Sequence, residues 1–331
     1  MSIQRRVPFL FALLLLGAFA FVACVQVRVT AAPPAQASSG AWVASKLMAP
    51  LSAELTGKIA VVRGGAVLVW QGGSLKQLTW KERYEGPSWS PDSSRLAIVL
   101  RGDNHSDVVV LDEDGNQLDQ LTHFFSPVSV SRSIWARHPA WSPDGSKIAY
   151  CSDSSSTDLG LWVMDADGSN KRLLVQPLGS GGLDWPSWSP DGTEIAFSAF
   201  IYPVSQIYTA NVTTGVAAPL TSQAGGAYDP AWSPDGRHIA YVAREGDRND
   251  IWVSNVDGTE ATRLTQTGSS VSPAWSPDGQ YLAYLTLYGK GFDLEAARLE
   301  EDGRMGLKTA QTWRLTQDAL LEGPSGVSWT K

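Results

Sequence analysis

The residues best suited to bind a ligand or to move a proton stand directly before a recurrent tripeptide, Pro-x-Trp. They are acidic, aromatic or basic, so a rim built from them would suit a cation, a sugar or a basic peptide segment. These candidates are Tyr84, Glu85, Arg137, His138, Asp184, Trp185, Tyr228, Asp229 and Glu322. The alternative is that the same side chains cap strands and hold water in a channel.

Enzymatic chemistry would have to come from this same set. A carboxylate pair such as Asp184 and Asp229 could serve glycoside chemistry, and His138 is the one rim imidazole available to a Ser-His-Asp triad. The sequence has no GxSxG and no HExxH motif, and its two cysteines allow no zinc spacing. We therefore predict a non-catalytic protein without cofactor or metal; the alternative is a carbohydrate-active hydrolase or lyase that uses the rim carboxylates.

A second candidate surface is the long connection "HFFSPVSVSRSIWAR" at 123–137. It carries four apolar side chains, Phe124, Phe125, Ile134 and Trp135. Apolar side chains on a surface loop can mark a site for a protein partner. Alternatively, the loop folds over the domain and buries them.

A twelve-residue string, "PAWSPDGRHIAY" at 230–241, explains how these residues are positioned. Close copies occur at 87–98, 139–150, 186–197 and 273–284, and their tryptophans lie 52, 47, 44 and 43 residues apart. This period is typical of one four-stranded propeller blade per repeat. Within a copy, the pattern predicts a strand, an SPDG turn and a second strand, and the later Asp-Gly hairpin predicts two more.

The aspartates of the SPDG strings have two possible roles. They could be calcium ligands, but no later glutamate completes an EF-hand pattern. We therefore interpret them as turn formers that bond the nearby backbone. Ser93 replaces the turn glycine in the first copy, and we expect the turn to tolerate it.

The two ends of the repeat array complement each other. Residues 57–79 match the second to fourth strands of a blade, and "GPSGVSWTK" at 323–331 matches a first strand. We predict that the two pieces complete a sixth blade, which removes free sheet edges. The fold class is therefore all-β: a six-bladed propeller of four-stranded blades, closed by the C-terminal strand joining the N-terminal blade.

The repeated string P-x-W-S-P-D-G-x-x-I-A-[YF] resembles the WD40-like repeat of TolB-type propellers over residues 57–331. This resemblance implies six blades, in agreement with the count from the repeats. It also implies an envelope protein, since TolB works with the Tol–Pal system. TolB carries an α/β domain before its propeller, and residues 25–56 are too few for one, so the resemblance extends to the propeller and not to the Tol–Pal role.

The N-terminus predicts export. Two arginines precede an apolar run from Val7 to Ala23, which is typical of a signal sequence. "FVAC" resembles a lipobox with Cys24 as the lipidated residue, whereas "VTA" and "AQA" further on suit an ordinary signal peptidase, and an uncleaved anchor is also long enough. We assign residues 1–24 to the signal or anchor, 25–56 to a linker and 57–331 to the propeller.

The formal net charge of −7 disfavours nucleic acid as a partner, because the chain offers no basic surface to a phosphate backbone. Every version of the N-terminus places the propeller outside the cytoplasm, in the periplasm or at the cell surface. We therefore predict a monomeric binding or scaffold protein for an envelope or secreted protein or peptide. It would contact the membrane only through its N-terminal anchor.

Overall fold

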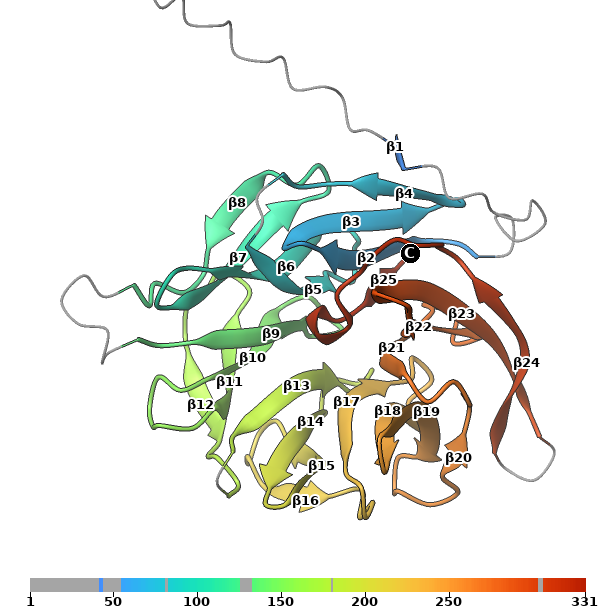
Figure 1. Ribbon diagram of the computed structural model, residues 1–331. Helices are drawn as coiled ribbons and strands as arrows, with labels where there is room; N and C mark the ends of the chain where they lie inside the picture. Colours follow the sequence, from blue (N-terminus) through green and yellow to red (C-terminus); the bar gives the residue numbers. More distant parts are fainter. Residues whose placement is uncertain (1–41, 44–54, 81–82, 126–132, 180, 303–305) are drawn as a thin grey trace, which may run out of the picture. The chain divides into compact units, whose positions relative to one another are not determined.

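Six antiparallel sheets radiate around a central channel in the described part of the chain (Figure 1). The computed structural model describes residues 42–43, 55–80, 83–125, 133–179, 181–302 and 306–331, all within the unit Gly40–Lys331. The prediction of an all-β, six-bladed propeller is confirmed. No helix in these ranges has the length and apolar character needed to cross a membrane. Residues 1–24 and the proposed lipidation site Cys24 lie outside the described residues.

Each blade contains four strands, numbered here from the innermost strand outwards. Blade 1 has β25 (Ser328–Thr330), β2 (Lys58–Arg63), β3 (Ala66–Gln71) and β4 (Ser74–Gln77), and blade 2 has β5 (Tyr84–Trp89), β6 (Arg95–Arg101), β7 (Ser106–Asp112) and β8 (Gln117–Gln120). Blade 3 has β9 (Ala136–Trp141), β10 (Lys147–Ser152), β11 (Gly160–Asp165) and β12 (Arg172–Val175), and blade 4 has β13 (Leu183–Trp188), β14 (Glu194–Ile201), β15 (Val204–Asn211) and β16 (Ala217–Pro219). Blade 5 has β17 (Ala227–Trp232), β18 (His238–Glu245), β19 (Arg248–Asn255) and β20 (Thr262–Arg263), and blade 6 has β21 (Ser270–Trp275), β22 (Tyr281–Tyr288), β23 (Gly291–Glu301) and β24 (Leu307–Arg314).

The hydrophobic core lies between neighbouring blades. Second strands such as β6 carry continuous apolar runs because the blades on both sides bury them. The tryptophan of each P-x-W sits in these layers: Trp89 packs with residues of blades 1 and 2, and Trp188 packs with residues of blades 3 and 4. The repeated tryptophans therefore hold blade to blade, as the repeat predicts.

The SPDG turns satisfy their own polar groups. In the second copy, Ser142 Oγ donates to Asp144 Oδ1 at 2.6 Å and accepts the Lys147 N–H at 2.9 Å. Hydrogen bonds from Ser142 and Ser146 lower the pKa of Asp144 to about 2. The fourth turn residue has a left-handed backbone, with φ of 70° at Gly145. Ser93 adopts the same conformation, with φ of 63°, and its hydroxyl lies 2.7 Å from Thr330 Oγ1.

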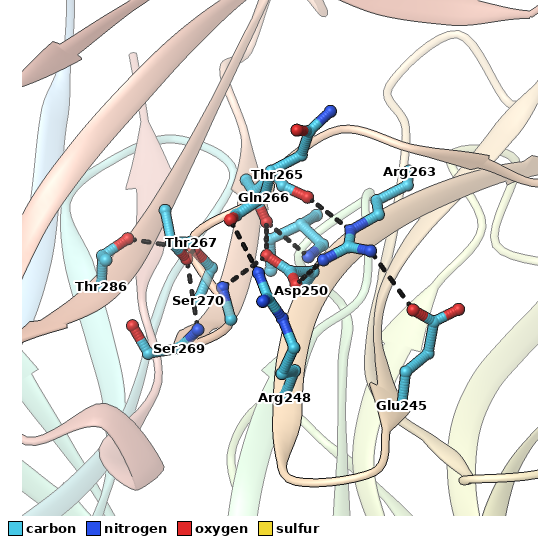
Figure 2. A network of polar contacts seen from close by, with 12 residues as sticks. Glu245, Arg248, Asp250, Arg263, Thr265, Gln266, Thr267, Ser269, Ser270 and Thr286 are labelled. Atoms are coloured by element: carbon cyan, nitrogen blue, oxygen red, sulfur yellow. Dashed lines mark hydrogen bonds and ion pairs between the residues drawn. The ribbon is translucent and has the colours of Figure 1, made fainter.

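Threonines after the fourth strands fasten the outer part of each blade. Thr265 Oγ1 accepts the N–H of Ile251 and donates to the buried Asp250 at 2.9 Å. Figure 2 shows this carboxylate held also by Arg263, which in turn reaches Glu245. The threonine bond to the third strand recurs in blades 1, 2, 4 and 6, at Thr79, Thr122, Thr221 and Thr316. The sequence analysis missed this feature, which appears as a repeated Leu-Thr pair.

The ring closes as predicted. β25 pairs antiparallel with β2 through Lys58–Thr330, Ile59–Trp329 and Ala60–Ser328 (Figure 1). The Trp329 indole donates to Thr56 O at 2.9 Å. Ser328 Oγ accepts the Trp89 N–H at 2.9 Å, so the closing strand also bonds to blade 2.

Part of the predicted linker 25–56 belongs to the folded domain. β1 (Trp42–Val43) pairs with β4 at the outer edge of blade 1. Leu55 is buried among core residues of blades 1 and 6. Core packing therefore begins before residue 57, because Leu55 supplies an apolar side chain to the seam between these two blades.

Candidate functional site

Two faces of the ring are defined by the chain path. The loop face carries the loops between second and third strands and the connections between blades; the turn face carries the SPDG turns. The residues that precede P-x-W stand at the loop-face end of the first strands. Function is therefore sought first on the loop face and in the channel below it.

A left-handed residue interrupts the first strand in every blade. These residues are Gly86, His138, Trp185, Asp229, Ser272 and Gly326, with φ between 43° and 81°. Strand registers shift at this point in blades 2 to 6, which is the mark of a β-bulge. The bulge was not predicted, because four of the six residues are not glycine.

The channel is a cavity of about 400 Å³ lined by the first strands of all six blades. Trp185 crosses its loop-face end. The indole stacks on His138 with ring centres 3.5 Å apart, and a Cβ added at Gly326 on the opposite blade would lie 2.8 Å from it. Trp185 thus narrows the channel at the loop face, and Gly326 leaves the space that this requires.

Three charged groups surround this tryptophan. Asp184 Oδ1 lies 2.5 Å from His138 Nδ1, and its Oδ2 lies 3.5 Å from the Arg137 guanidinium. Burial would raise the pKa of Asp184, but the charges of His138 and Arg137 and the hydrogen bonds to the carboxylate outweigh it, so its pKa is lowered. Asp184 is therefore ionised and holds the imidazole in place.

Asp229 has the opposite environment. Its residue is only 6% exposed, and burial raises the pKa of its carboxyl to about 7, although Ser272 and His138 favour the charged form. The negative charge of Asp184 adds to the increase. Two carboxyl groups with separated pKa values and an imidazole therefore meet at the loop-face end of the channel, an arrangement that can exchange protons.

The other predicted rim residues lie further out. Glu85 pairs with Arg101 at 2.8 Å, and Tyr84 is buried, which raises its pKa. Tyr228 packs against the core between blades 5 and 6, and burial together with the charge of Asp229 raises its pKa to about 12. Glu322 lines a pocket beside Tyr84 and Glu85.

The prediction that Glu322 and Gly323 precede the last first strand is wrong in its register. Gly323–Ser325 form a short 3-10 helix, η3, and Gly326 takes the position of the left-handed residue. Pro324 resembles the proline of P-x-W in sequence but begins this turn instead. Glu322 Oε1 accepts the Gly65 N–H at 3.1 Å, and its Oε2 accepts from Ser325 Oγ at 3.0 Å.

The four apolar residues of the loop 123–137 have separate environments; residues 126–132 between them lie outside the described residues. Phe124 packs against the core between blades 2 and 3, whereas Phe125 is 61% exposed and makes an edge contact with His105. Trp135 is partly buried and lines a pocket between blades 2 and 3. Ile134 is also partly buried.

Exposed apolar side chains concentrate on the loop face. Ten large apolar side chains of the described residues are exposed, and seven of them lie in loop-face connections or hairpins. The seven are Trp80, Phe125, Ile201, Tyr202, Leu287, Tyr288 and Leu320. Only Phe125 was predicted; the others stand beside turn residues outside the repeated string.

The described residues form no group of three or more histidine, cysteine or acidic side chains that could hold a metal ion. Within the same ranges, the His138 side chain hydrogen-bonds to Asp184 and to no hydroxyl group. The site can therefore bind through charge and stacking, while the Asp184–Asp229 pair is the feature that acid–base chemistry would use.

Comparisons with known proteins agree with the fold. Residues 154–290 match the family model described as PD40, TolB beta propeller domain. TolB from Acinetobacter baumannii aligns with a TM-score of 0.64 and 21% identity over 83% of this chain and 66% of that one. A putative TolB from Agrobacterium tumefaciens aligns with a TM-score of 0.58 and 20% identity, over 83% and 99%.

A chain in the crystal structure of a nidogen/laminin complex has a TM-score of 0.59 and 11% identity, over 83% of this chain and 98% of that one. At these identities the likeness establishes the fold alone. The present chain spans just under two thirds of the Acinetobacter protein. A comparison with curated proteins finds no match. The repeats and the six-bladed ring together identify the chain as a TolB-like β-propeller protein with PD40 repeats.

Proposed function

We propose that this chain is a non-catalytic, extracytoplasmic binding or scaffold protein whose loop face receives a protein partner. The observation that carries the proposal is the placement of seven of the ten exposed large apolar side chains on that one face. Clustered exposed apolar side chains with polar surroundings are typical of protein interaction sites. The turn face offers Val216 and Val256 for comparison.

The location of the protein follows from the N-terminal sequence. Arg5, Arg6 and the apolar run to Ala23 support export, and Cys24 would tether the propeller if it is lipidated. The similar fold of the TolB structures supports an envelope role. The propeller would work as a monomer, in the periplasm or at the cell surface.

Affinity capture from detergent-solubilised envelopes tests the proposal, with the exported chain as bait. The test variant replaces Phe125, Tyr202 and Leu320 with alanine, and the control replaces Val216 and Val256 with alanine. We expect the wild type and the control to retain a common partner that the test variant loses. A partner retained equally by all three proteins would exclude the loop face.

A carbohydrate-active hydrolase or lyase is the second candidate. It is favoured by one observation: Asp184 and Asp229 lie close enough to influence each other's charge, and their pKa values are shifted in opposite directions. A saccharide screen compares the wild type with Asp184→Asn and Asp229→Asn. Turnover that both substitutions abolish would establish an enzyme and refute the non-catalytic proposal.

A further inference from the structure

A pocket of about 360 Å³ opens on the loop face between blades 2 and 3. Trp135 and Leu159 supply apolar walls, and Arg101 and Arg137 supply two guanidinium groups. Ser106 joins the two blades there: its Oγ donates to Ala136 O at 2.7 Å and accepts the Ala136 N–H at 2.9 Å. We name this cavity the rim pocket.

The acceptor groups of the rim pocket already have partners. Glu85 Oε1 lies 2.8 Å from the Arg101 guanidinium, and Asp153 Oδ1 accepts the Trp135 N–H at 2.7 Å. The carboxylates at the pocket are therefore engaged within the protein. A ligand that supplies further acceptors would meet free donors rather than free acceptors.

The donor groups are far less used. A guanidinium has five N–H donors. Arg101 uses one of them in its bond to Glu85, and Arg137 makes only the 3.5 Å ion pair with Asp184 among the described residues. Both side chains are exposed, at 59% and 48%. Two such groups beside one cavity can form charge-assisted bonds to a carboxylate.

A second pocket, of about 330 Å³, continues from the rim pocket towards blade 1. The two cavities share Glu85 and Arg101, and the second one extends to Tyr84, Arg83 and Glu322. A ligand anchored in the rim pocket therefore has a continuous path across the Glu85–Arg101 pair. This path fits the preceding residues of a peptide, whereas a free small acid would leave it empty.

From this geometry we infer that the rim pocket binds the C-terminal carboxylate of a peptide chain that ends in an apolar residue. Arg101 and Arg137 hold the carboxylate, and Trp135 and Leu159 contact the terminal side chain. The residues before it lie in the second pocket, near Arg83 and Glu322. The inference rests on the proposed function, since it names the part of a protein partner that the loop face recognises.

The test is fluorescence polarisation with a fluorescein-labelled tetrapeptide of three alanines and a C-terminal leucine. The peptide is used as the free acid and as the C-terminal amide, and N-acetyl-leucine serves as a small-acid competitor. We expect the acid to bind at least about tenfold more tightly than the amide, which matches the loss of charge-assisted hydrogen bonds. N-acetyl-leucine should compete only weakly.

Arg137→Gln should remove the preference for the acid. The matched control is Arg237→Gln, which alters an exposed arginine of a turn-face SPDG turn and should keep the preference. Thermal unfolding of both variants checks that the propeller is intact. Equal affinity for acid and amide, or no binding of either peptide, would overturn the inference. Competition by N-acetyl-leucine as strong as that of the tetrapeptide would overturn the assignment to a chain terminus.

The capture experiment separates this inference from the proposed function. A partner that depends on Phe125, Tyr202 and Leu320, combined with no binding of the tetrapeptide, would leave the loop-face function standing and refute the rim pocket. Binding of the free acid without any captured partner would have the opposite meaning.

Discussion

Asp229 makes the stability of the propeller depend on pH. Its carboxyl is 6% exposed, and its pKa in the folded protein is about 7, compared with 3.8 for an unperturbed aspartate. Between these values the folded state binds more protons than the unfolded state, so the free energy of unfolding falls as pH rises. The full penalty of about three pH units corresponds to roughly 4 kcal/mol at ~1.4 kcal/mol per unit.

About half of this penalty, roughly 2 kcal/mol, falls between pH ~5.5 and pH ~8.5, because the remainder is already lost at lower pH. Asp229→Asn removes the charge while preserving the shape of the side chain. The variant should therefore be stabilised relative to the wild type at the higher pH, and its own stability should depend less on pH by about 2 kcal/mol. This is a sizeable share of the ~5–15 kcal/mol of a typical domain.

Guanidinium unfolding followed by tryptophan fluorescence at both pH values measures the effect. Asp247→Asn is the control, because Asp247 is fully exposed on a loop and should leave the pH dependence of the wild type unchanged. If Asp229→Asn and the wild type lose the same free energy of unfolding between the two pH values, the account of Asp229 is refuted.

Three further perturbations test the fold and the channel. Deleting residues 323–331 should lower the thermal midpoint of the whole domain in one cooperative transition, and an unchanged midpoint in calorimetry would contradict the closure through β25. Gly326→Ala should displace Trp185, because the added Cβ would lie 2.8 Å from the indole, and should destabilise by about 1–3 kcal/mol; unfolding titrations and a shift of tryptophan emission report it. Thr265→Val should cost about 1–3 kcal/mol, since it leaves the buried Asp250 without one of its donors, and Thr267→Val, at a more exposed position, should cost less in the same denaturant titration.

Local turn chemistry made the blades predictable. The SPDG string encodes a turn through residues that bond within five positions of one another, such as Ser142, Asp144 and Lys147. Repetition of this short unit then determines the blade period and, with the complementary ends, the closure of the ring. No long-range information was needed for this part.

The site was harder to predict because its geometry depends on contacts between blades. His138, Trp185 and Asp229 adopt a left-handed backbone that their residue types do not announce. Arg101 joins the rim pocket from the end of a second strand, where no repeated string points to it. Glu322 was placed in the wrong register because Pro324 imitates the repeat. Phe124 and Phe125 are adjacent in sequence, yet one packs inward and the other faces solvent.

The seam of the ring also determines how the protein responds to force. Lys58 pairs with Thr330 at the end of the antiparallel β2–β25 ladder where the chain enters one strand and leaves the other. A pull applied between residues 56 and 331 would therefore load the pairs one after another, as in a zipper, rather than shearing them together. The Trp329 indole bond to Thr56 O lies at this same end and would take the load first. The seam is thus a mechanical release point, and a tethered propeller pulled through both ends would open there before any other blade separates.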